Sequence, residues 1–223
     1  MWLINSPVGR KFVMGITGAA LVLFLLFHSM MNVVVLFSEE AYNAVCAFLG
    51  ANWYAVVATM GLTALVGIHF LYAVILTFQN RRARGKDKYA VTTRQEGVEW
   101  SSKNMFILGL VICCFLVLHL YQFWAKMQFV ELTHLGDVEK AADGAYWINF
   151  YFRQPLYAIT YIVLLAGLWF HLTHGIWSAM QSFGLSNKTW LPRWKSISNI
   201  VSTIIIALFM AVPIVYLIKS LIG

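Results

Sequence analysis

Five long apolar stretches separated by polar connections dominate the pattern of hydrophobic and polar positions along the chain. Each stretch holds about 20 or more mainly apolar residues, the length a helix needs to cross the hydrocarbon core of a bilayer. The stretches take up about half of the chain, so we expect one domain over residues 1–223 and no separate soluble domain. The predicted fold class is an all-α integral membrane protein with five transmembrane helices, over residues 12–37, 55–78, 104–126, 156–180 and 200–221.

Composition supports this assignment. Of the 223 residues, 61% are hydrophobic and 11% are charged, whereas a soluble domain has roughly 45–50% apolar and about 25% charged residues. The net charge of +7 could suggest a nucleic-acid partner, but the basic residues are distributed as a membrane topology requires. We therefore expect contact with membrane lipid and no nucleic acid.

The basic residues place the N-terminus in the cytoplasm and the C-terminus outside. With that orientation, 12 of the 16 Lys and Arg residues lie on the inner side, and six of the nine acidic residues lie on the outer side. Such a bias is the signature of the positive-inside rule. The inner basic residues are Arg10, Lys11, Arg81, Arg82, Arg84, Lys86, Lys88, Arg94, Lys103, Lys188, Arg193 and Lys195.

Four of the five apolar stretches each contain a histidine well inside the predicted span: His28, His69, His119 and His171. An imidazole at that depth has no water to satisfy its ring nitrogens and needs a partner. One such histidine per helix suggests two sites with two histidine ligands each. Haem iron is the most natural occupant of such sites in a membrane bundle.

The depth of each histidine sorts the four into pairs. At about 1.5 Å per residue, His28 and His119 lie about 22–24 Å from the inner edge of the membrane, and His69 and His171 about 13–14 Å from it. The first pair belongs to the first and third helices, and the second pair to the second and fourth. We therefore predict a haem-binding four-helix bundle of helices 1–4, with an outer and an inner haem and the fifth helix flanking it.

Two other interpretations compete with haem. A single buried histidine is more often hydrogen-bonded to a neighbouring helix than bound to a metal, although four at two matched depths are hard to explain by packing. A zinc or proton transporter also uses intramembrane histidines, but usually with acidic residues beside them, and no Asp or Glu lies within any of the five predicted spans. His174, three residues after His171, is a competing ligand, but depth favours His171.

Several segments share a recognisable order and spacing. They are residues 9–18 (GRKFVMGITG), residues 24–28 with Asn32, His69 with residues 77–84 (TFQNRRAR), and residues 170–179 (FHLTHGIWSA) with Gln181. These segments resemble the cytochrome b membrane anchor of the succinate:quinone oxidoreductase and quinol:fumarate reductase family, in its single-chain, five-helix, diheme form. The match extends through essentially the whole chain, and the order and spacing of the motifs are more specific than any single motif.

The resemblance implies two b-type haems, with His69 and His171 binding the inner haem and His28 and His119 the outer one. It also implies a flavoprotein subunit and an iron–sulfur subunit on the cytoplasmic face of a bacterial inner membrane, with dicarboxylate chemistry on another subunit. The electron carrier would be a quinone, and diheme anchors of this kind resemble those that work with menaquinone. Some relatives carry a glutamate two residues before the fourth-helix ligand for transmembrane proton movement; this chain has Trp169 there, so that route is not expected.

Polar residues near each haem level are candidates for contacts with quinone or with haem propionates. At the outer end, the connection between helices 1 and 2 supplies the quinone-site candidates Glu39, Glu40, Tyr42, Asn52 and Trp53. At the inner end, the propionate or quinone candidates are Ser6, Arg10, Arg82, Asn104, His174 and Gln181. The cytochrome subunit of another quinone-linked dehydrogenase, of the formate dehydrogenase or hydrogenase type, is the alternative function, and a haem-free transporter is a further one.

Overall fold

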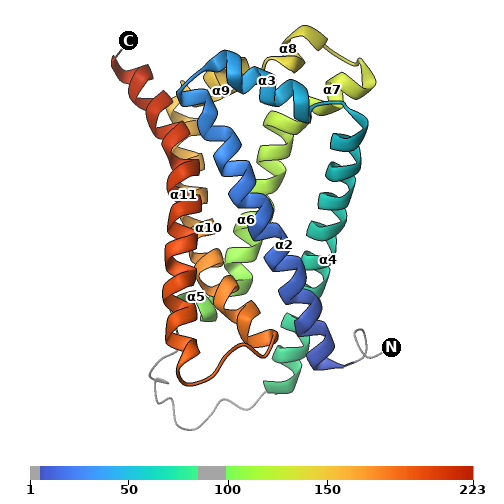
Figure 1. Cartoon of the computed structure of the whole chain (residues 1–223), viewed down its shortest axis with the longest axis vertical. Coiled ribbons are helices and arrows are strands. Elements are labelled where there is room, and N and C mark those ends of the chain that lie inside the picture. Colours follow the sequence, from blue (N-terminus) through green and yellow to red (C-terminus); the bar gives the residue numbers. More distant parts are fainter. Residues whose placement is uncertain (1–5, 85–98, 223) are drawn as a thin grey trace.

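The computed structural model describes residues 6–84 and 99–222, and the regular secondary structure of these parts is all helical (Figure 1). Lys86, Lys88 and Arg94, which contribute to the predicted charge bias, lie outside the described residues. Five helices are long and apolar enough to cross a membrane, at Pro7–Leu36, Trp53–Ala83, Met105–Trp124, Pro155–Ser182 and Trp190–Ile222. The prediction of an all-helical chain with five apolar helices of membrane-spanning length is confirmed for the described residues.

The long helices overlap the predicted spans and extend beyond most of their ends. They are α2 (Pro7–Val33), α4 (Trp53–Arg84), α6 (Met105–His119), α10 (Pro155–Ser182) and α11 (Trp190–Ile222). Local signals set some of these ends. Ser6 caps α2, because its Oγ accepts a hydrogen bond of 2.9 Å from the Gly9 amide. Prolines occupy the first turns of α2 and α10, where their missing N–H has no helical partner to lose.

Short helices cover one end of the bundle. They are α3 (Glu39–Leu49), α7 (Gln128–Thr133), α8 (Val138–Ala142) and α9 (Gly144–Phe152), and they lie together at the end where α11 finishes (Figure 1). The Asn43 side chain joins α3 to the start of α9: its Nδ2 donates to Asp143 Oδ1 at 2.8 Å, and its Oδ1 accepts from the Ala145 amide at 2.9 Å. We refer to this end as the outer end and to the opposite end, which holds the short helix α5 (Trp100–Lys103), as the inner end.

The buried Gln128 ties α4 to the rest of the outer end. Its Oε1 accepts hydrogen bonds from Thr59 of α4 at 3.0 Å and from the Trp124 indole at 2.8 Å, while its Nε2 donates to the Gly50 carbonyl at 2.9 Å. The Gln128 side chain therefore links α4, the end of the third span and the Gly50 connection by hydrogen bonds.

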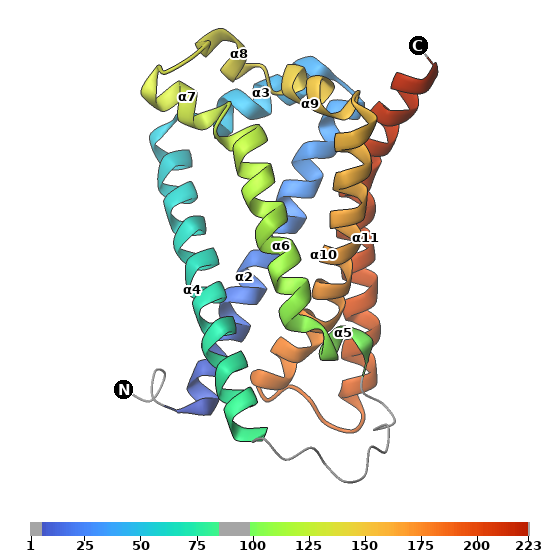
Figure 2. The ribbon, with the colours of Figure 1, turned by 180° about the vertical axis from the view of Figure 1, so that it is seen from behind.

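The fifth helix is part of the core, and the prediction that it only flanks the bundle is wrong. Ile205 and Ile206 of α11 are buried in a cluster with Leu165, Leu168 and Leu172 of α10. The least buried of the five spans is α4, the second span in the sequence. Figures 1 and 2 show α2 running obliquely through the bundle, with its outer end near α11 and its inner end near α4. Hydropathy alone cannot rank the helices by burial, because a lipid-facing side chain and a core side chain are equally apolar.

Candidate functional site: two histidine pairs in the bundle

The structure brings the four predicted histidines together as two pairs. The ring centroids of His28 in α2 and His119 in α6 lie 5.8 Å apart, with the rings nearly perpendicular at 83°. The ring centroids of His69 in α4 and His171 in α10 lie 6.4 Å apart at 66°. Each pair therefore joins two helices that are far apart in the sequence.

The spacing of each pair fits two imidazoles on opposite sides of one metal ion. A histidine nitrogen binds a transition metal at about 2 Å, and the ring centre lies roughly 1 Å farther, so such a pair has centroids about 6 Å apart. His171 Nδ1 is also buried and has no hydrogen-bond partner in the described part of the chain. The residues present therefore fit a pair of haem ligands at each level.

Thr17 of α2 contacts the inner pair. Its hydroxyl donates to the Val13 carbonyl at 3.0 Å or the Met14 carbonyl at 3.1 Å, and its oxygen lies 3.1 Å from His69 Nδ1. With the hydroxyl proton on a backbone carbonyl, the Thr17 oxygen is an acceptor for a proton on His69 Nδ1. That arrangement leaves the lone pair of His69 Nε2 free to bind a metal.

The next residue, Gly18, allows this approach of α2 to α4. A Cβ atom at Gly18 would lie 3.3 Å from His69 Cε1, closer than most side chains tolerate. The Thr17–Gly18 dipeptide thus supplies both a hydrogen-bond acceptor and the room for the His69 ring.

The outer pair lies in aromatic surroundings. Phe24 stacks on the His28 ring at a centroid distance of 5.3 Å, and Phe209 of α11 lies 5.6 Å from it. Around His119 the neighbouring rings are Phe115, Phe123 and Tyr161, at centroid distances of 5.2–6.3 Å. These rings exclude water from the outer pair.

Asn32 and Tyr42 connect the outer pair to the outer end. Asn32 Nδ2 donates to the His28 carbonyl at 2.8 Å and lies 3.4 Å from His28 Nε2. The Tyr42 hydroxyl, from α3, donates to Asn32 Oδ1 at 3.4 Å. Among the outer candidates in the described residues, Tyr42 is therefore the one connected to a histidine, because Asn32 bridges it to His28 by two hydrogen bonds.

A π-helical segment, Leu120–Trp124, begins directly after His119 and was not predicted from the hydropathy pattern. Such a segment inserts an extra residue into a helical turn and is frequent at functional sites. It places the side chain of Gln122 in the core, where Gln122 is 2% exposed and its Oε1 accepts a hydrogen bond of 2.7 Å from the Tyr161 hydroxyl. Tyr161 is thereby held against the His119 ring.

The other outer candidates do not gather at one place. Glu39 and Glu40 are exposed in the first turn of α3, where negative charge stabilises a helix N-terminus. Asn52 Nδ2 donates to the carbonyls of Ala47 and Phe48 at the end of α3, at 2.9 and 3.1 Å. Trp53 is 79% exposed at the start of α4.

The inner candidates also separate. Ser6 is used as the cap of α2, and Arg10 lies in the same helix near its start. Arg82 and Gln181 are exposed, and Asn104 Nδ2 donates to the Trp100 carbonyl at 2.9 Å. His174 is the exception: its Nδ1 is buried, and its ring lies 4.7 Å from the ring of Trp177.

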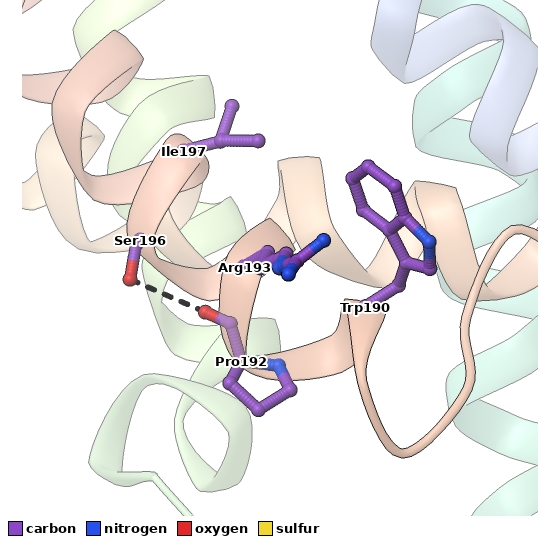
Figure 3. Close-up of a pocket in the computed structure, with 5 residues that line it drawn as sticks. All are labelled: Trp190, Pro192, Arg193, Ser196 and Ile197. Atoms are coloured by element: carbon purple, nitrogen blue, oxygen red, sulfur yellow. Dashed lines mark hydrogen bonds between the residues drawn. The ribbon is translucent and has the colours of Figure 1, made fainter.

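A shallow surface pocket at the start of α11, with a volume of about 390 Å³, contains none of the predicted site residues. Figure 3 shows its lining, in which the Arg193 guanidinium lies 5.1 Å from the centroid of the Trp190 ring. Trp and Arg side chains are typical of the membrane–water interface. We interpret this pocket as part of the inner interface.

The Cys46 thiol of α3 gives a test of packing at the outer end. Burial, with added repulsion from Glu131 and Asp143, raises its pKa to about 11. An unfolded thiol ionises near pH 9, so the folded state loses stability relative to the unfolded state as the pH rises from about 9 to about 11. We expect iodoacetamide to leave Cys46 unmodified at pH 8 and to modify it increasingly toward pH 11, as measured by peptide mass spectrometry. Complete modification of Cys46 at pH 8 would contradict this packing.

Comparison of the chain with protein-family models, curated proteins and solved structures gives no match. The resemblance to a cytochrome b anchor therefore rests on the residues and motifs quoted above.

Proposed function

We propose that the chain is a diheme membrane anchor that passes electrons between a membrane quinone and an iron–sulfur subunit of a succinate dehydrogenase or quinol:fumarate reductase complex. The observation that supports this most is the meeting of four histidines from four helices as two separate pairs. Zinc sites use at least three protein ligands, whereas bis-histidine haem iron uses two. Within the described residues, no group of three or more His, Cys, Asp or Glu side chains forms a candidate metal site.

In this proposal each pair holds one b-type haem, and the two haems together supply one-electron transfer across the membrane interior. The chain's own residues do the rest. Thr17 holds the His69 proton on Nδ1, so that Nε2 is the ligand atom. Around the outer pair, Phe24, Phe115 and Phe209 exclude water, which favours electron transfer over reaction with oxygen.

The family resemblance supplies the rest of the proposal. The flavoprotein and iron–sulfur subunits dock on the inner, cytoplasmic face, near the His69–His171 pair, and the membrane is the bacterial cytoplasmic membrane. The quinone is menaquinone. The N-terminus lies in the cytoplasm and the C-terminus outside, which agrees with an odd number of spans.

Isolation of the complex from native membranes in mild detergent tests this assignment. We expect flavin and iron to co-purify with the chain, and we expect succinate to reduce part of its b-type absorbance. Reduction by formate or hydrogen but not by succinate would instead assign the chain to another quinone-linked dehydrogenase. Absence of any b-type absorbance would leave a haem-free transporter.

Replacement of Thr17 by valine, which has nearly the same shape, tests the proton assignment at the inner pair. Loss of the hydrogen-bond partner of a metal-bound histidine typically weakens metal binding by about 10–100-fold. We expect the inner haem of Thr17→Val to transfer to an excess of apomyoglobin about 10–100-fold faster than in the wild type. Thr17→Ser, which keeps the hydroxyl, is the matched control and should behave as the wild type; equal transfer from all three proteins would remove Thr17 from the site.

A further inference from the structure

One side of α11 lines the surface pocket at the inner end of the bundle. The lining residues are Trp190, Pro192, Arg193, Ser196 and Ile197, which lie within about half of the helix circumference. The pocket volume of about 390 Å³ is in the range of sites that bind small molecules, roughly 300–1,000 Å³. Figure 3 shows the Arg193 side chain between Trp190 and Ile197. The pocket therefore presents one cationic group beside apolar and aromatic side chains.

A row of contacts holds the Arg193 guanidinium in place. The Trp194 indole donates a hydrogen bond of 2.8 Å to the Leu185 carbonyl, which fixes that ring. The Trp190 ring lies 5.7 Å from the Trp194 ring, and the Arg193 guanidinium lies 5.1 Å from the centroid of the Trp190 ring. Each of these side chains limits the freedom of the next one, so a ligand of Arg193 binds with a smaller loss of side-chain entropy.

The charge of Arg193 is not paired within the part of the chain that the structure describes. The ion pairs there join Lys140 to Asp137 and Lys195 to Glu99, the second at 2.8 Å. A guanidinium presents its N–H donors in a planar fork that matches two oxygens of a phosphate group. The unpaired charge and its geometry therefore favour an anionic ligand that carries a phosphate.

An exposed apolar track continues from Arg193 toward the middle of α11. Ile197, Ile200 and Ile204 lie 4, 7 and 11 residues after Arg193 and share its side of the helix, with exposures of 37%, 60% and 52%. The track is about 16 Å long, measured along the helix axis from Arg193 to Ile204. An inorganic anion cannot cover it, whereas a ligand with a phosphate head and a long apolar chain can.

We propose that Arg193 binds the phosphate of an anionic phospholipid in the leaflet at the inner end, with one acyl chain along Ile197, Ile200 and Ile204. Basic pockets between transmembrane helices at the membrane surface bind acidic lipid head groups in this manner. The Trp190 ring is at the level of the head group, where tryptophan is enriched in membrane proteins. This inference goes beyond the proposed function, because it holds whether or not the chain binds haem.

The test is native mass spectrometry of the full chain in detergent, titrated with phosphatidylglycerol and with phosphatidylcholine of the same acyl chains. We expect one phosphatidylglycerol to bind about tenfold or more tightly than phosphatidylcholine. Arg193→Gln should weaken phosphatidylglycerol binding about tenfold or more, the usual effect of one lost hydrogen bond to a charged group. Lys188→Gln is the matched control, because it removes an exposed positive charge near the same helix end but outside the pocket lining. This variant should bind phosphatidylglycerol as the wild type does.

Equal binding of the two lipids by the wild type would overturn the proposal, and this comparison does not depend on the folding of any variant. An equal loss in Lys188→Gln and Arg193→Gln would also overturn it, because a general attraction by positive charge would then explain the binding. Displacement of phosphatidylglycerol by an equal concentration of inorganic phosphate would indicate a site for free anions. Unchanged lipid affinity in Arg193→Gln, with loss of the co-purifying iron, would assign the pocket to a protein subunit instead.

Discussion

Replacement of His171 by alanine is expected to reduce the haem content from two to one per chain. His171 and His69 are the two imidazoles that meet at the inner level within the described residues, with centroids 6.4 Å apart, so the variant would keep only one of the two side chains that would hold a haem there. Haem is measured as the pyridine haemochrome, relative to protein determined by amino-acid analysis.

His174→Ala is the control for this experiment, because His174 lies on the same helix and its Nδ1 atom is also buried. We expect this variant to keep two haems per chain. Two haems in His171→Ala and one in His174→Ala would reassign the ligand to His174. The paired variants therefore separate the two histidines that the sequence motif leaves in competition.

Replacement of His119 by alanine is expected to remove the outer haem and leave the inner one. The outer pair is formed by His119 and His28, at a centroid distance of 5.8 Å, and the rings of Phe115 and Phe123 beside it offer no nitrogen to replace the lost ligand. Redox titration of the variant should show one b-type component where the wild type shows two.

Tyr161→Phe is the matched control at the outer level. It keeps the ring against His119 but removes the hydrogen bond to the buried Gln122, which should lower the free energy of unfolding by about 1–3 kcal/mol. Both haems should remain. Loss of the outer haem in Tyr161→Phe but not in His119→Ala would contradict the assignment of His119.

Much of this architecture could be predicted because the membrane constrains it. Span length predicts the number of helices, and the alternation of their direction along the chain converts sequence position into depth. That reasoning predicted which histidine would face which, and His28 does lie beside His119, as His69 does beside His171.

Other features depend on side-chain geometry and could not be predicted in this way. The burial of α11, with Phe209 against His28, follows from packing between helices that are equally apolar. The π-helical segment after His119 has no marked sequence signal. The role of Thr17 depends on the approach of α2 to α4, since a threonine within an apolar helix usually bonds only to its own backbone.

The outer candidates for a quinone site show the limit of selection by residue type. Glu39 and Asn52 are polar and lie at the outer end, but both serve α3, Glu39 in its first turn and Asn52 at its end. Helix ends in a connection require such side chains whether or not a ligand binds there.

The reduced-minus-oxidised visible spectrum of the purified chain tests the central claim most directly. We predict an α-band of b type, with a pyridine haemochrome equivalent to two haems per chain. A purified, folded chain without this band would contradict the proposal that the two histidine pairs bind haem.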